Sequence, residues 1–163
     1  MSRKIKFITG EYYHIYNRGV DKRQIFTNNG DYMRFINCVN KFNQDLVSFV
    51  TYNLVNNHYH FALKQLKDGG ITKLMHKLGI GYTLYFNKKY HRSGSLFESV
   101  FKAIHIDSED YLLFLCKYIH NNTEKHGLAK NKNWVWSSYS QYFSNDSGQH
   151  TIKVSSLRLK NLL

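Results

Sequence analysis

Hydrophobic and polar positions alternate in some stretches of this chain and recur at wider intervals in others. The run from Glu11 to Asn17 alternates and is rich in aromatic and β-branched residues, which predicts a β-strand. Two more strand-like runs, Leu46–Val55 and His58–Lys64, meet at Asn56-Asn57, a pair that tolerates the left-handed backbone of a tight hairpin. A fourth strand is expected over Leu96–Ile106.

Three other stretches repeat apolar residues at intervals of three and four, which is the spacing of an amphipathic helix. The expected helices cover residues 31–44, 70–90 and 111–122. Asn28 or Asn29 is suited to cap the first helix, and Gly69-Gly70 opens the second. Ser108 is expected to cap the third, because two acidic residues follow it where the helix dipole favours negative charge.

The order of these elements is strand, helix, hairpin, helix and strand, which matches the split βαβ arrangement of ferredoxin-like sheets. We therefore predict an α+β fold in which helices cover one face of an antiparallel sheet and the other face is open to a ligand. The helix over 111–122 is an addition near the C-terminus. After residue 131 we expect a loop in which Trp134, Trp136 and Tyr139 fold back on the core. One domain over 1–143 and a mobile tail over 144–163 are expected.

Charge adds an electrostatic argument to this pattern. The 163 residues include 23 Lys and Arg against 11 Asp and Glu, so the formal net charge is +12. Such a field attracts polyanions, which makes nucleic acid the leading partner class. A chain rich in Lys and Asn is also what a biased genome composition would give, so charge alone is weak evidence.

Cysteine spacing and hydropathy exclude several classes of protein. Cys38 and Cys116 lie far apart, each in an apolar helical pattern, which indicates neither a zinc knuckle nor a disulfide framework and fits a reducing cytosol. The first ten residues lack the apolar core of a signal peptide. No stretch approaches the ~20 apolar residues of a membrane span, so we expect a cytoplasmic protein without a membrane partner.

Two histidines stand one residue apart in the third strand-like run, in the sequence His58-Tyr59-His60. On a strand, residues two apart project to the same face with Cα atoms about 6.5 Å apart, so both imidazoles can bind one metal ion. On a helix the same pair would diverge by about 200°, so the metal hypothesis requires the strand. The alternative is a chance pair of polar residues on a wet sheet face.

The last predicted helix offers a nucleophile and a further ligand. Tyr118 and Asn122 are four residues apart, so they lie on the same side of a helix. Tyrosine can serve as a covalent nucleophile, but a phenol with the ordinary pKa of about 10 is mostly protonated near neutral pH and needs a cation close by. An ion held by His58 and His60 would supply that cation. Core packing is the alternative interpretation of Tyr118.

Five sequence blocks resemble a known family, the HUH (His-hydrophobic-His) single-tyrosine transposases, and within it the REP-associated tyrosine transposases. The blocks are YHIYNRG (Tyr13–Gly19), NHYHF (Asn57–Phe61), GSLFESVFKA (Gly94–Ala103), YIHNN (Tyr118–Asn122) and WVWSSYSQY (Trp134–Tyr142). No single block is specific, whereas five in the family's order are. Two positions depart from the family pattern, because Asn56 and Thr123 stand where prolines are usual, so the hairpin and the helix end are less rigidly specified.

The resemblance implies a mechanism and a set of site residues. His58 and His60 would bind a divalent ion, and Asn122 would complete its ligands or orient the attack. Tyr118 would attack a phosphodiester of single-stranded, hairpin-bearing DNA and leave a 5′-phosphotyrosine and a free 3′-OH, and strand transfer would reverse this step. Imidazole ligands favour Mn, Co or Zn, whereas the resemblance implies Mg²⁺ or Mn²⁺, which we take as the expected cofactor.

Basic residues near these elements are candidates for binding DNA phosphates. They are Arg18, Lys22, Arg23, Lys88, Lys89, His91, Arg92 and Lys102. Each of them alone is more often a solvated surface charge, so the prediction depends on their clustering near the site.

Two other functions compete with a transposase. The first is a binding module that holds hairpin DNA or RNA without cutting it. The second is a zinc-dependent hydrolase. It is the weaker alternative, because its carboxylate base should lie near the histidines and none is found within several residues of them. The sequence favours the transposase. It leaves open whether the protein is a monomer or a homodimer that exchanges the tyrosine helix.

Overall fold

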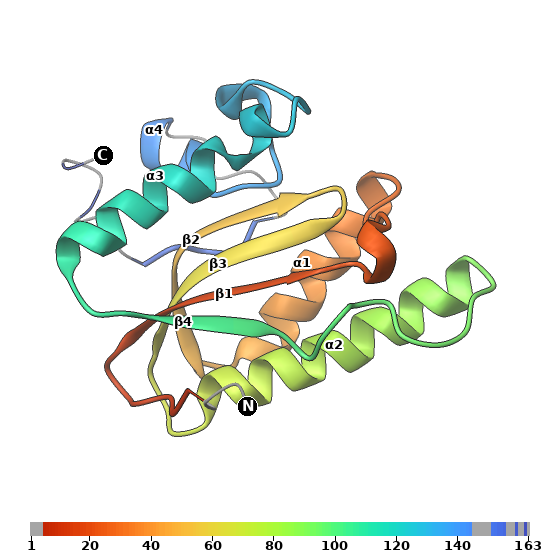
Figure 1. Cartoon of the computed structure of the whole chain (residues 1–163), viewed down its shortest axis with the longest axis horizontal. Helices are drawn as coiled ribbons and strands as arrows, with labels where there is room; N and C mark the ends of the chain where they lie inside the picture. The colour runs from red at the N-terminus through yellow and green to blue at the C-terminus, as the bar shows by residue number, and fades with distance from the viewer. Residues whose placement is uncertain (1–4, 145–150, 156–158, 160–161, 163) are drawn as a thin grey trace.

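A computed structural model describes residues 5–144, 151–155, 159 and 162 of the chain. Its centre is a four-stranded antiparallel sheet with the strand order β2-β3-β1-β4 (Figure 1). The strands are β1 (Tyr12–Arg18), β2 (Val47–Val55), β3 (His58–Gln65) and β4 (Lys102–Ile106). The helices are α1 (Asn29–Asn43), α2 (Gly70–Lys89), α3 (Glu109–Lys125), α4 (Tyr139–Phe143) and the short 3₁₀ helices η1 (Val20–Lys22) and η2 (Asn131–Asn133). The predicted α+β fold with split βαβ order is confirmed.

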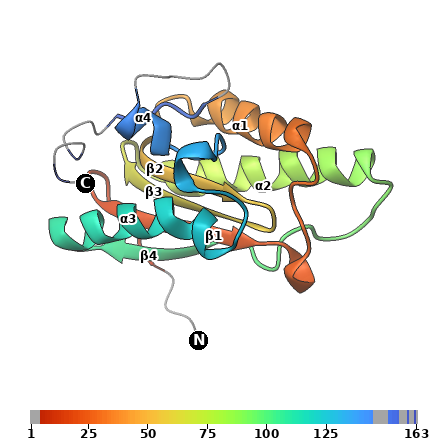
Figure 2. The same cartoon turned by 90° about the horizontal axis from the view of Figure 1, so that it is seen from above.

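The helices lie on both faces of the sheet. α1 and α2 cover one face, and α3 runs along the other (Figure 2). The face under α1 and α2 holds the main apolar core, to which Ile15, Phe35 and Phe61 contribute with fully buried side chains. α3 carries its own apolar stripe, including Leu115 and Ile119, and packs against β2 and β3. The open face that the sequence predicts is therefore partly covered by the additional helix.

The β2–β3 hairpin positions the histidine pair. It turns at Asn56-Asn57, as predicted, and pairs Val55 with His58 at the first rung of β3. Because side chains alternate along a strand, His58 and His60 lie on the side of α3, whereas Tyr59 packs in the core beside Phe35.

Capping residues set the helix starts as the sequence predicts. The Asn28 side chain accepts a hydrogen bond from the Asp31 amide, and the Ser108 side chain accepts one from the Tyr111 amide. α3 continues past its predicted end, and Thr123 keeps the backbone amide that a proline at this position would lack. Among the described residues, no helix has both the length and the apolar composition that crossing a bilayer requires.

The fourth strand is shorter than the sequence predicts. Regular pairing with β1 begins only at Lys102, although the pattern indicates a strand from Leu96. The buried side chain of Asn17 donates hydrogen bonds to the carbonyl groups of Ser99 and Val100, at 2.8 and 3.1 Å. The chain bends there because these carbonyls bind a side chain instead of a neighbouring strand.

The segment after α3 folds back on the core, as expected from its aromatic residues. The Trp136 ring stacks on Tyr32 with centroids 4.8 Å apart, and Nε1 of Trp134 donates to the Leu54 carbonyl at 3.0 Å. The Tyr139 ring lies 5.6 Å from the ring of His120 on α3. These contacts tie the segment to both α1 and α3.

Part of the predicted mobile tail is packed against the sheet. Val154 forms a parallel bridge with Phe49 of the edge strand β2, and Ile152 is 2% exposed. Within the tail expected over 144–163, residues 151–155 thus bury apolar side chains beside β2. Apart from 144, 159 and 162, the other residues of that stretch lie outside the described part of the chain.

Candidate active site

A cleft of about 400 Å³ opens on the side of the sheet that α3 covers. Its lining includes His58 and His60 of β3, Arg18 of β1, Lys22 of η1, Lys102 of β4 and Glu98. The structure thus brings the histidine pair together with three of the predicted DNA-binding residues. These side chains come from three separate parts of the sequence, around residues 18–22, 58–60 and 98–102.

The two histidines are neutral neighbours inside this cleft. Their ring centroids are 5.1 Å apart, and His58 and His60 are 9% and 8% exposed. Burial lowers the pKa of His58 despite an opposing hydrogen bond to Asn122, and it lowers the pKa of His60 well below the ordinary range. Both imidazoles are therefore uncharged near pH 7, which is the form that binds metal ions.

The ring nitrogens show which atoms face the cleft. Nδ1 of His58 lies 2.6 Å from Oδ1 of Asn57, and Nδ1 of His60 lies 2.9 Å from Nε2 of His14. Nε2 of His58 lies 2.8 Å from Oδ1 of Asn122. Within the described residues, Nε2 of His60 has no hydrogen-bond partner. The Nε2 atoms of both rings are thus left on the cleft side, as in a metal-binding pair with bonded Nδ1 atoms.

The donor set fits a hard or borderline divalent ion. With its proton on Nδ1, the neutral ring of His58 directs a lone pair from Nε2 at the amide oxygen of Asn122, and a cation satisfies both atoms. His58, His60 and Asn122 are then two imidazoles and one oxygen donor, which Mn²⁺ and Mg²⁺ accept together with water or phosphate oxygens. In the described part of the chain, no cluster of three His, Cys, Asp or Glu side chains forms an alternative metal site.

α3 brings the predicted tyrosine to this pair. The half-buried ring of Tyr118 lies 5.9 Å from the ring of His60, edge to face at 82°. Asn122, one turn further along α3, is 2% exposed and contacts His58. Nζ of Lys125 lies 5.5 Å from the centroid of the Tyr118 ring. The Tyr118 ring therefore lies beside His60, and the Asn122 amide lies beside His58.

Buried hydrogen bonds hold α3 on the sheet of its own chain. Nδ2 of Asn53 on β2 donates to a backbone carbonyl of α3 and to Oγ1 of Thr123, both at 2.8 Å. Nε2 of His120 lies 2.9 Å from Oγ1 of Thr51 and 2.9 Å from Oγ of Ser138. Because these groups are buried, separating α3 from β2 would leave them without partners.

Two cations and one carboxylate form the wall of the cleft opposite α3. Nη2 of Arg18 and Nζ of Lys102 each lie 3.0 Å from an oxygen of Glu98. Hydrogen bonds from Lys102 and from Arg18 lower the pKa of Glu98. Arg18 and Lys102 remain partly exposed toward the cleft, so each keeps N–H groups for a further anion.

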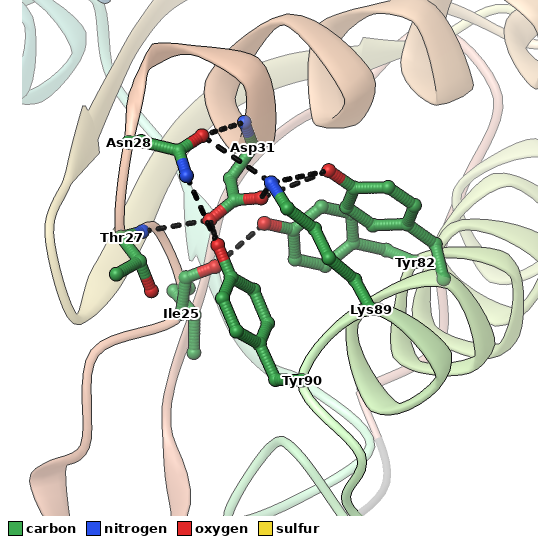
Figure 3. A network of polar contacts seen from close by, with 8 residues as sticks. Ile25, Thr27, Asn28, Asp31, Tyr82, Lys89 and Tyr90 are labelled. Carbon is green, nitrogen blue, oxygen red and sulfur yellow. Dashed lines mark hydrogen bonds and ion pairs between the residues drawn. The ribbon is translucent and has the colours of Figure 1, made fainter.

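The other predicted DNA-binding residues, Arg23, Lys88, Lys89, His91 and Arg92, do not line the cleft. Lys89 lies 2.7 Å from the fully buried carboxylate of Asp31, so its ammonium is held by the fold (Figure 3). Arg92 donates to Oδ1 of Asn87 at 2.9 Å, and Nε of Arg23 donates to a backbone carbonyl at 3.0 Å. Lys88 and His91 are exposed.

Two residues of the site, His14 behind His60 and Glu98 in the cleft, have no signal of their own in the sequence. His14 contacts His60 only because β1 and β3 pair in one register, and Glu98 joins the cleft through the bend before β4. Both lie inside family-like blocks, Tyr13–Gly19 and Gly94–Ala103, which is the signal that could have pointed to them.

The strand order β2-β3-β1-β4, with α3 crossing β3 so that the Tyr118 ring lies beside His60, defines an α+β protein with a polar site between sheet and helix. The sequence signature of the family described as "Transposase IS200 like" matches residues 8–122. The chain therefore belongs to the IS200-like transposase family, which confirms the resemblance seen in the sequence.

Solved structures add a comparison of the fold. A REP-associated tyrosine transposase bound to a REP hairpin superposes with a TM-score of 0.73 at 13% identity, and the match covers 96% of this chain and 99% of that chain. A candidate transposase from Deinococcus radiodurans R1 matches with a TM-score of 0.38 at 13% identity, over 74% of this chain and 97% of that chain, too weakly to support an argument. No curated protein sequence matches the chain.

Proposed function

We propose that the protein is a metal-dependent endonuclease and strand transferase that acts on single-stranded, hairpin-bearing DNA through a 5′-phosphotyrosine intermediate. The observation that carries the proposal is the contact of α3 with β3, which places Tyr118 beside His60 and Asn122 against His58. Membership of a transposase family supports DNA cleavage. The hairpin in the structure of the REP-associated transposase supports the choice of substrate.

His58, His60 and Asn122 would hold the divalent ion, Mg²⁺ or Mn²⁺. Such an ion, when bound, supplies a Lewis acid that polarises the scissile phosphate. Burial keeps both imidazoles neutral and so removes the cost of displacing a proton from them near pH 7. Asn57 contacts Nδ1 of His58, which fixes the direction of Nε2, the nitrogen that faces Asn122.

The phenol oxygen of Tyr118 would attack the phosphorus, releasing its proton to water in the cleft. The bond from phosphorus to the 3′ oxygen breaks, and that oxygen takes up a proton to become a free 3′-OH. The 5′ phosphate stays on Tyr118 as a diester, so rejoining needs no external energy source. Arg18, Lys22 and Lys102 line the same cleft and would bind the neighbouring phosphates.

The position of Glu98 favours this chemistry over a zinc-dependent hydrolase. The structure does bring a carboxylate into the cleft, which the sequence did not foresee. Both of its oxygens are bound by cations, and its pKa is lowered, so it is a poor base for activating water. A hydrolase that relies on this carboxylate would first have to release it from Arg18 and Lys102.

A complete site within one chain supports a monomer as the active unit. α3 is fixed to β2 by Asn53 and Thr51, which leaves the tyrosine helix on its own sheet. Exchange of α3 with a second copy would have to break these buried bonds. Of the two arrangements that the sequence leaves open, the homodimer with an exchanged helix is thus the less favoured.

A covalent-adduct assay tests the proposal. Protein is incubated with labelled hairpin-bearing single-stranded DNA and Mn²⁺ or Mg²⁺ and examined on a denaturing gel. The wild type should give a metal-dependent adduct and a nick, Tyr118→Phe should bind DNA without an adduct, and Tyr111→Phe on the same helix should behave as wild type. Binding without adduct or nick by the wild type would favour the binding module. An adduct in Tyr118→Phe would mean that another residue is the nucleophile.

A further inference from the structure

A second groove, of about 420 Å³, lies beside the cleft, between α2 and residues 95–100. Ile80 and Leu84 of α2 form one side, and Val100 forms part of the other. These three side chains are 50%, 66% and 75% exposed, which is unusual for large apolar residues gathered in one place. Glu98 lines both the groove and the cleft, so the two adjoin.

The outer side of α2 is basic as well as apolar. Exposed residues follow one another at intervals of three and four and so form one stripe along the helix. The stripe consists of Lys73, Lys77, Ile80, Leu84 and Lys88. α2 contains no acidic residue, and Glu98 is the only carboxylate among the groove-lining residues that the structure describes. Arg18 and Lys102 neutralise that carboxylate.

We propose that this groove binds the single-stranded DNA that continues beyond the cleft, and this rests on the function proposed above. An unpaired strand offers apolar base faces together with phosphates, which suits apolar side chains bordered by lysines. Duplex DNA presents its phosphates but hides its base faces. A second copy of the chain is a poor occupant because each carries a net charge of +12. An anionic membrane is a less suitable partner, since Leu74 and Leu78 of α2 are buried in the core and cannot insert into a bilayer.

Binding of oligothymidylates of two lengths tests the groove. The short one, of about 2 nucleotides, is comparable in size to the cleft, whereas one of about 24 nucleotides also reaches the groove. Fluorescence anisotropy compares the wild type with two double variants. One combines Ile80→Ser and Leu84→Ser, and the other combines Lys73→Gln and Lys77→Gln. We expect each to weaken binding of the long strand about 5- to 10-fold and to leave the short strand within about 2-fold.

Matched controls separate the groove from general effects. Lys130→Gln with Lys132→Gln removes the same charge from another exposed region, and Val135→Ser removes one exposed apolar side chain; both should bind the long strand as wild type does. The proposal that the groove binds DNA would be overturned if the groove variants bound both strands with wild-type affinity, or if their affinity for both strands fell by the same factor. The groove would also be refuted as a DNA site if the serine substitution of Leu84 weakened binding of the protein to phosphatidylserine vesicles but did not weaken its binding to DNA. A wild type that binds neither strand would overturn the proposed function itself.

A different observation concerns His14 of β1. Its ring is buried and stacks with those of Tyr16 and His60, with centroids 4.8 and 5.2 Å away. Its Nε2 is 2.9 Å from Nδ1 of His60, and this is the only hydrogen bond of the His60 side chain among the described residues. His14 therefore touches a candidate metal ligand on the side away from the metal.

The bond between the two rings holds one proton in one of two arrangements. With the proton on Nδ1 of His60, the Nε2 atom of that ring keeps a lone pair for a metal ion. With the proton on Nε2 of His14, Nε2 of His60 carries a proton and cannot bind metal. We infer that His14 is a positioning residue that accepts the Nδ1 proton and keeps His60 in its metal-binding tautomer. This inference rests on the proposed metal site.

Two substitutions distinguish this role from packing. His14→Gln keeps an acceptor oxygen, whereas His14→Phe keeps a ring of similar shape without an acceptor. Ring ¹⁵N chemical shifts report the His60 tautomer, and titration with Mn²⁺ alone gives the Kd. We expect His14→Phe to move His60 toward the Nε2–H tautomer and to raise the Kd about 10- to 100-fold. His14→Gln and the stacking control Tyr16→Phe should stay within about 3-fold of wild type.

The result that would overturn the role of His14 is a His14→Phe protein with the wild-type His60 tautomer and the wild-type Kd. An equal loss in His14→Phe and His14→Gln would also overturn it, because the acceptor would then not matter. A wild type that does not bind Mn²⁺ would refute the metal site, while the ¹⁵N shifts still decide what His14 does to His60. Thermal unfolding of each variant checks that the fold is retained.

Discussion

Two polar clusters are buried on opposite faces of the sheet, and they differ in how completely their atoms are bonded. Around Asp31, under α1 and α2, every oxygen of the carboxylate is bound: one by Lys89 and Tyr85, at 2.7 and 2.9 Å, and the other by Tyr90 and the Thr27 amide, at 2.7 and 2.9 Å (Figure 3). Such a saturated cluster has no capacity left for a ligand and serves the fold.

The cluster under α3 is built of similar groups but is not saturated. The ring of His60 has one bonded nitrogen and one without a partner among the described residues, and neutral His58 has a single N–H for the two amide oxygens, of Asn57 and Asn122, that its ring nitrogens face. Unfilled bonding capacity in a buried site is costly unless a ligand uses it. Comparison of the two clusters therefore separates a structural polar centre from a functional one better than burial or charge does.

The largest expected effect is on stability, from Asp31→Ala. This change leaves Lys89 and two tyrosine hydroxyls without their acceptor, and we expect a loss of about 3 kcal/mol in the free energy of unfolding. Urea denaturation measures it, with the exposed Asp68→Ala as the matched control. Binding of Mn²⁺ should not change. A loss below about 1 kcal/mol, no larger than for an ordinary surface change, would remove the distinction between the two clusters.

A smaller effect should come from filling the unsaturated cluster. When free Mn²⁺ is at about 50 times its Kd, binding to the folded state adds about 2.3 kcal/mol of stability to the wild type. His58→Gln should lose this gain and yet be about as stable as wild type without metal, because it removes a group that serves the ligand and not the fold. Urea denaturation with and without Mn²⁺ gives both numbers. A metal-independent loss as large as that of Asp31→Ala would contradict the comparison.

The smallest effect is an acid dependence that belongs to the saturated cluster. Burial favours the neutral acid, but the hydrogen bonds led by Lys89 and Tyr90 outweigh it and lower the pKa of Asp31. A carboxylate with a lowered folded-state pKa stabilises the protein fully above its unfolded pKa of about 4, and this stability is lost as the pH falls through the folded-state value. Asp31→Asn should therefore lose less stability than wild type between pH 5 and pH 2 in urea denaturation, and equal slopes would contradict the assignment.

The sequence predicts much of this molecule because local rules decide it. Asn28 and Ser108 cap their helices as expected, and strand alternation alone places His58 and His60 on one face. Helical spacing likewise puts Tyr118 and Asn122 on the side of α3 that meets the sheet. Each of these features depends on residues within one turn or one strand, so no knowledge of the tertiary structure is needed.

Features that depend on register and long-range contacts escape such an analysis. The bond from His14 to His60 requires the pairing of β1 with β3, and the bond from Lys89 to Asp31 joins residues 58 positions apart. The sequence therefore indicates Lys89 as a DNA-binding candidate, whereas in the fold its ammonium forms an ion pair with Asp31. The bend before β4 has the same origin, since the amide of Asn17 that causes it belongs to another strand.

The attachment of α3 to β2 has a consequence for kinetics. Asn53, Thr51 and His120 anchor Tyr118 and the two imidazoles on one polypeptide, so a lone molecule contains every residue of the proposed nicking site. The initial rate of nicking should then rise in direct proportion to enzyme concentration, down to the most dilute samples that can be measured. A second-order rise would show that two molecules must meet before either one reacts.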